Sequence, residues 1–123
     1  MVALCVGLAL LQGCRRQTAS FAELQFTHEV SPQPPRVGQT TINLRVMDDS
    51  GKPASGLRVE FEANMSHAGM APVLANAIEV EKGNYRATLD LTMAGDWIVV
   101  AHITLADGRK LDHQFEINGV ASK

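Results

Sequence analysis

The feature that most constrains the fold of this chain is an alternation of apolar and polar side chains with a period of two residues. In the segment LRVEFEA, Leu57, Val59 and Phe61 alternate with charged residues. Successive side chains of a β-strand point to opposite faces, so this period places the apolar residues on one face. Segments rich in glycine, proline and aspartate separate the alternating segments. The pattern predicts half-buried strands joined by turns.

Further segments of this kind follow one another at short spacing. The expected strands are residues 23–30, 40–48, 57–63, 77–80, 85–91, 97–105 and 110–117. Such spacing is typical of a sandwich or a barrel. We therefore expect an all-β fold, an immunoglobulin-like antiparallel β-sandwich of about seven strands. Residues 22–123 would form this single domain.

The N-terminus is apolar almost without interruption from Met1 to Leu11 and then reaches Cys14. A membrane-spanning helix needs about 20 residues, whereas this length matches the hydrophobic region of a secretory signal. The segment LLQGC resembles a bacterial lipobox, whose cysteine is acylated. We predict a signal peptide over 1–13, a lipidated Cys14 with a tether over 14–21, and a membrane-anchored lipoprotein in the periplasm or another extracytoplasmic space. An ordinary cleaved signal or a short membrane anchor is the alternative.

Several classes of function are excluded by composition and motifs. The net charge is −2 and there is no extended basic cluster, which argues against nucleic-acid binding. Both cysteines, Cys5 and Cys14, precede the predicted domain, which would therefore contain neither a disulfide nor a thiol nucleophile. A Gly-x-Ser-x-Gly elbow and a phosphate-binding glycine loop are also absent from the sequence. We expect that the protein is not an enzyme.

One connecting segment, NMSHAGMAP, is unlike the polar turns because it carries a Met-x-His-x-x-Met pattern and no charged side chain apart from any protonated histidine. In a seven-stranded sandwich, successive connections alternate between the two ends. This segment, the proline-rich SPQPPRVGQ and the corner TMAGD would therefore share one end. The donors gathered there would be Met65, His67, Met70 and Met93, with His28 close by as a weaker candidate.

These side chains suit a soft metal ion. Thioether sulfur is a soft donor and imidazole a borderline one, a combination that selects Cu(I). The Met-x-His-x-x-Met pattern would supply three ligands and Met93 a fourth. As loop residues they could be replaced without unfolding the sandwich. The alternatives are core packing for Met65, packing against the Trp97 indole for Met93, and an ordinary surface position for His67.

The remaining histidines point to structural roles. His102 lies inside the apolar segment IVVAHITL, where we expect a hydrogen-bonded histidine of the core or of a sheet face. His113 shares a strand face with Phe115 and is expected to be structural. The sequence shows no spacing of histidine, cysteine and carboxylate residues that is typical of a zinc site.

Two long segments resemble a known family. VGQTTINLRVMDDSGKPASGLRVEFEANMSHAGM and EKGNYRATLDLTMAGDWIVVAHI are similar to the YtkA-like domain, which also occurs in FixH-type proteins. The resemblance extends from about residue 35 to residue 117 and is most specific in MSHAGM, Gly-x-Tyr and MAGDW. It implies a small secreted or membrane-anchored bacterial domain linked to copper handling and, in the FixH branch, to assembly of respiratory cytochrome oxidase. It points to Met65, His67 and Met70 as ligands, with Met93 as a candidate.

We therefore expect an extracytoplasmic lipoprotein domain that binds Cu(I) for storage or delivery. Its partner would be a membrane-bound copper donor or acceptor, such as a respiratory oxidase or an efflux protein. The alternative is a non-metal interaction module that docks on a membrane protein through its apolar loop end, because methionine-rich surfaces also suit adaptable protein contacts.

Overall fold

The computed structural model describes residues 24–66 and 69–122. The predictions for the signal peptide, for Cys14 with its tether, and for His67 lie outside the described residues. The strands are β1 (Gln25–Ser31), β2 (Gly38–Met47), β3 (Arg58–Met65), β4 (Val73–Asn76), β5 (Ile78–Glu81), β6 (Asn84–Leu91), β7 (Gly95–Thr104) and β8 (Lys110–Val120). In the described part of the chain, no helix is long and apolar enough to cross a membrane.

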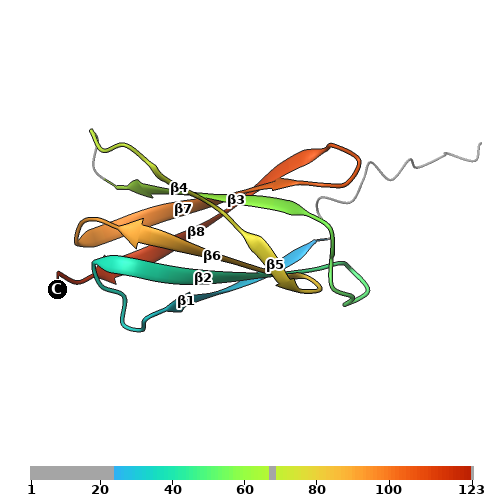
Figure 1. Cartoon of the computed structure of the whole chain (residues 1–123), viewed down its shortest axis with the longest axis horizontal. Coiled ribbons are helices and arrows are strands. Elements are labelled where there is room, and N and C mark those ends of the chain that lie inside the picture. The colour runs from blue at the N-terminus through green and yellow to red at the C-terminus, as the bar shows by residue number, and fades with distance from the viewer. Residues whose placement is uncertain (1–23, 67–68, 123) are drawn as a thin grey trace, which may run out of the picture.

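The strands form two four-stranded antiparallel sheets packed face to face, with orders β1-β2-β6-β5 and β4-β3-β7-β8 (Figure 1). The predicted all-β sandwich is confirmed, with eight strands where about seven were expected. The extra strand is β4, which pairs with β3 before the chain crosses to β5 in the other sheet. The crossing occurs at Ala77, whose backbone N–H donates a hydrogen bond to the Val59 carbonyl at 2.8 Å.

The core lies between the two sheets and follows the alternation seen in the sequence. Ile42, Leu44 and Val46 of β2 are completely buried, as is Phe61 of β3. Trp97 of β7 is the largest of the fully buried side chains. Burying one such apolar side chain stabilises a fold by about 1.5–3 kcal/mol, so these inward faces supply the main attraction between the sheets.

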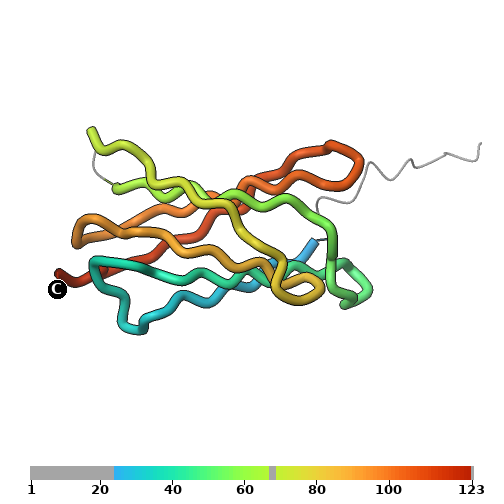
Figure 2. The backbone as a smooth tube through the Cα atoms, in the orientation of Figure 1, coloured from blue at the N-terminus to red at the C-terminus, as the bar shows by residue number. Residues whose placement is uncertain are grey.

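The connections divide between the two ends of the sandwich (Figures 1 and 2). Connections 32–37 and 92–94, and residues 69–72 before β4, lie at one end, which we call the methionine end. Connections 48–57, 82–83 and 105–109 lie at the other, which we call the turn end. β1 begins at the turn end, because Gln25 pairs with Met47, the last residue of β2. The alternation of ends expected from the sequence is thus present.

Stacked rings bridge β1 and β8, the strands at the same side of the two sheets. The ring of Phe26 stacks on His113 with centroids 4.4 Å apart, and the ring of His28 stacks on Phe115 at 4.1 Å. Burial lowers the pKa of His113, and the nearby charge of His28 lowers it further. The structural role expected for His113 is therefore the bridging of these edge strands.

A carboxylate organises the turn end. Glu79 accepts hydrogen bonds from the backbone N–H of Gly83 at 3.0 Å and of Gly56 at 3.1 Å, and from the Ser55 hydroxyl at 2.8 Å. The Gly83 bond is the largest of the interactions that lower the pKa of Glu79 below its ordinary value of 4.5. Beside it, the Tyr85 hydroxyl donates to the Ala54 carbonyl at 2.7 Å. Glu79 thereby ties β5 to two neighbouring connections.

Two glycines of the turn end offer a matched test of packing. Gly51 and Gly83 have φ angles of 82° and 78°, a region that costs an L-residue roughly 1–2 kcal/mol. A Cβ atom on Gly51 would meet nothing within 4 Å, whereas one on Gly83 would lie 2.7 Å from the Cβ atom of Pro53. We expect Gly83→Ala to lower the free energy of unfolding by about 1–3 kcal/mol more than Gly51→Ala. Urea denaturation measures both, and equal losses would contradict the close packing of Gly83 on Pro53.

The Glu79 contacts predict a pH dependence of stability. Because the pKa of Glu79 is lowered on folding, the stability that it contributes is present above its ordinary pKa and is lost as the pH falls through the folded pKa. The free energy of unfolding of the wild type should exceed that of Glu79→Gln at pH 7, and the gap should narrow below about pH 4.5. Glu81→Gln controls for the loss of one negative charge. If the difference in free energy of unfolding between the wild type and Glu79→Gln stays constant down to pH 3, the lowered pKa of Glu79 does not stabilise the fold.

Candidate functional site

Met65 is a core residue at the edge of the methionine end. It is the last residue of β3, pairs with Trp97 of β7, and is only 7% exposed. Its Cε atom lies 3.2 Å from the position that a Cβ atom would take on Gly95. Its side chain packs in the core, one of the roles left open by the sequence. The expectation that Met65 is a loop residue is wrong, because the alternation of β3 continues to its last residue.

Met70 and Met93 lie on two connections of the methionine end and are 41% and 44% exposed. The Trp97 indole N–H donates a hydrogen bond to the Met93 carbonyl at 2.9 Å. Trp97 therefore fixes the backbone of Met93, while Met93 itself is nearly half exposed. Two thioether side chains are thus available to solvent at this end.

Hydrogen bonds to Asp96 of β7 tie the end of β3 and the end of β8 to this strand near the methionine end. The N–H of Ser66, next to Met65, donates to the Asp96 carbonyl at 3.2 Å. The Asp96 carboxylate in turn accepts from the N–H of Gly119 in β8 at 2.8 Å. Asp96, three positions after Met93, thus binds both Ser66 and Gly119. His67 itself lies outside the described residues.

His28 lines a pocket with Gln33 and Pro35 of connection 32–37, although it is not part of a connection itself. It occupies the middle of β1, opposite Leu44, with its ring on Phe115. Ser31, the last residue of the strand, is three positions further along, about 10 Å away at 3.3 Å per residue. The strand ends one residue later than expected, and His28 as a weaker copper ligand stays a prediction.

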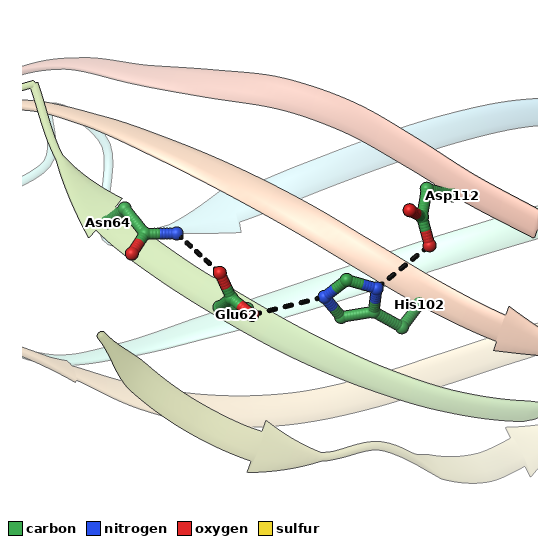
Figure 3. A network of polar contacts seen from close by, with 4 residues as sticks. All are labelled: Glu62, Asn64, His102 and Asp112. Atoms are coloured by element: carbon green, nitrogen blue, oxygen red, sulfur yellow. Dashed lines mark hydrogen bonds and ion pairs between the residues drawn. The ribbon is translucent and has the colours of Figure 1, made fainter. Parts of the chain in front are cut away.

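A polar network that sequence reasoning missed lies on the outward face of the sheet β4-β3-β7-β8 (Figure 3). His102 contacts Asp112 through Nδ1 at 2.8 Å and Glu62 through Nε2 at 3.2 Å. The second oxygen of Glu62 accepts a hydrogen bond from the Asn64 side chain at 2.8 Å. The prediction of a hydrogen-bonded sheet-face histidine is confirmed. These residues alternate outward along their strands, but the sequence does not reveal which strands are neighbours.

The charges of this network reinforce one another. The hydrogen bond to Asp112 has the largest effect and raises the pKa of His102 above its ordinary value; burial opposes it, and the bond to Glu62 raises the pKa further. The pKa of Glu62 is lowered, first by Asn64 and then by His102. The arrangement therefore favours a cation between two carboxylates.

Within residues 24–66 and 69–122, no group of three or more histidine, cysteine, aspartate or glutamate side chains is placed to hold a metal ion. Thioether donors belong to a different class of ligand. The methionine end thus offers soft donors, and the outward face offers one imidazole with carboxylates.

Comparison with known proteins gives a family and a fold. The family model described as YtkA-like matches residues 21–102. None of the curated proteins matches the sequence. A crystal structure of a DUF4426 family protein from Pseudomonas aeruginosa PAO1 is similar, with a TM-score of 0.60 and 17% identity, covering 84% of this chain and 96% of that chain. MtrC from Shewanella baltica OS185 aligns with a TM-score of 0.49 and 17% identity, over 81% of this chain and 22% of that chain. At this identity, the first likeness shows a shared fold.

The different burial of two methionines predicts different costs of replacement in the absence of metal. Met65→Ala should lower the free energy of unfolding by about 2–5 kcal/mol because it empties part of the core. Met93→Ala should change it by no more than about 0.5 kcal/mol. Met65→Leu preserves the volume and should cost less than about 1.5 kcal/mol. Urea denaturation of the three variants tests this order, and a Met65→Ala variant as stable as Met93→Ala would contradict it.

Proposed function

This chain belongs to the YtkA-like family, whose model matches residues 21–102, and we propose that it is an extracytoplasmic copper-binding domain that holds one Cu(I) ion at its methionine end. The family resemblance implies copper handling. The observation that carries the proposal is the placement of three methionines at one end of the sandwich. Apart from the N-terminal residue, the remaining methionine, Met47, ends β2 at the turn end.

The proposed donor set suits Cu(I) by its chemistry. Met70 and Met93 offer exposed thioethers, and the thioether of Met65 lies against Gly95, two residues after Met93. Methionine side chains are flexible enough to adjust to an ion. Soft neutral donors prefer Cu(I) over the hard cations. His67 would complete the set.

A site of this composition holds or transfers copper rather than reacting with it. A set of neutral thioethers at a solvent-exposed end permits exchange with a partner that offers similar donors. The partner would be a membrane-bound copper donor or acceptor, such as a respiratory oxidase or an efflux protein. Lipid on Cys14 would keep the domain at the membrane. Binding should weaken below about pH 6, because His67 must be deprotonated to bind the metal.

A Cu(I) titration in the presence of a reductant tests the proposal. The methyl NMR signals of Met65, Met70 and Met93 should shift, while that of Met47 should not. Met70→Leu and Met93→Leu should each lower the affinity by about tenfold or more, equivalent to about 1.4 kcal/mol. Met47→Leu is the matched control, since it removes a thioether at the other end. Failure to compete with a weak Cu(I) chelator would disprove the proposal.

The exposure of Met70 and Met93 favours one other function, docking of the methionine end on a membrane-protein partner without metal. Adaptable thioether surfaces suit such contacts. The same variants distinguish the two functions. Partner binding that is indifferent to copper and survives His67→Ala would support docking, whereas partner binding that requires Cu(I) would support copper transfer.

A further inference from the structure

On the outward face of the sheet β4-β3-β7-β8, Nε2 of His102 faces Oε1 of Glu62 at 3.2 Å. We propose that a divalent first-row metal ion, Zn²⁺ or Cu²⁺, binds between Nε2 of His102 and Oε1 of Glu62. These residues come from β7 and β3 and are partly exposed, so an ion can reach them from solvent. The proposal concerns other residues and another class of ion than the methionine end, and it stands independently of the Cu(I) site.

The His102 ring lies between two carboxylates. A neutral imidazole carries one N–H, and both ring nitrogens of His102 face a carboxylate oxygen. If Nδ1–H donates to Asp112, the lone pair of Nε2 faces an oxygen of Glu62. In the other tautomer, Nε2–H donates to Glu62 and the lone pair of Nδ1 faces the Asp112 oxygen instead. A protonated ring donates to both carboxylates, whereas a neutral ring leaves two acceptors in contact, so a metal ion can take the place of the second proton.

The distance between His102 Nε2 and Glu62 Oε1 fits a metal ion bound to both atoms. Zinc lies about 2.0–2.1 Å from a histidine nitrogen and about 2.0–2.2 Å from a carboxylate oxygen. Two such ligands that subtend an angle of about 100–110° at the metal are about 3.2–3.4 Å apart. The separation between His102 Nε2 and Glu62 Oε1 is 3.2 Å. An ion can replace the shared proton with little movement of either side chain.

Each proposed ligand is oriented by a second hydrogen bond. Metal-binding histidines commonly donate their second ring N–H to a carboxylate, and metal-binding carboxylates are themselves hydrogen-bonded. Asp112 takes the first role at 2.8 Å from Nδ1 of His102. Asn64 takes the second, donating to Oε2 of Glu62 at 2.8 Å. Both ligands are oriented before any metal arrives (Figure 3).

The ligand types select the ion. Imidazole and carboxylate favour Zn²⁺ and Cu²⁺, whereas Cu(I) favours the thioethers of the methionine end. Glu60 pairs with His102 in the β3–β7 register and adds negative charge beside it, partly offset by Arg58 and Lys110 along the same groove. In the described residues no third histidine or carboxylate completes a cage, so water fills the remaining positions. The site is therefore exchangeable rather than permanently occupied.

Zn²⁺ titration of the full chain, followed by the histidine ring NMR signals and by calorimetry, tests the proposal. His102 should respond first, before His28 and His113. Glu62→Gln should lower the Zn²⁺ affinity by about tenfold or more, and Asp112→Asn by about 10–100-fold. Glu116→Gln is the matched control, since it removes a carboxylate that contacts Asn118 as Glu62 contacts Asn64, and it should leave the affinity unchanged.

Two results would overturn the site. One is a Zn²⁺ response spread equally over His28, His102 and His113, which indicates adventitious surface binding. The other is an affinity of Glu62→Gln equal to that of the wild type, with both proteins folded by their amide spectra. Thermal unfolding gives a second readout, because Zn²⁺ should raise the melting temperature of the wild type more than that of Glu62→Gln. Loss of Cu(I) binding at the methionine end would leave these results unaffected.

Discussion

The structure depends on apolar burial between two sheets that no disulfide bond connects. Both cysteines precede residue 24, so a disulfide cannot join the inward faces, and Phe61, Trp97 and their neighbours supply the attraction instead. Everything at the two ends is held against this core. Trp97 shows the coupling most directly, since its ring is buried while its N–H holds the backbone of Met93. The backbone that carries the exposed Met93 is thus held by a residue of the core.

Much of the fold could be predicted because one face of each strand is buried and the side-chain period is two. That period placed Ile42, Leu44 and Val46 together, and the alternation of connections placed the methionine-bearing segments at one end. β4 was missed because it has only four residues and its sequence, VLAN, does not alternate clearly. The passage of the chain from one sheet to the other at Ala77 depends on pairing with β3, which no local pattern encodes.

The candidate sites were predictable to different degrees. The two-residue period of β3 predicts the burial of Met65, because Val59, Phe61, Ala63 and Met65 share one face. The same period in β1 places His28 on one face with Phe26. Residue type alone assigned both residues to the methionine end and took no account of their strand faces. The network of His102 could not be predicted, because Glu62 and Asp112 lie 40 and 10 residues away in sequence and meet His102 only through the register of three strands. Strand order is a property of the whole sandwich.

The direction of β1 decides how a tethered domain would be presented. The chain enters the sandwich at the turn end, and β2, which runs back from the methionine end, has ten residues, or about 33 Å of strand. With lipid on Cys14, as predicted, the tether would join the domain at its turn end, and a short tether would favour that end facing the bilayer. The thioethers of Met70 and Met93 would then stand outward, a domain's length from the headgroups. Copper exchange would take place at that height, so a membrane-bound partner would need to extend an extramembrane domain to meet it.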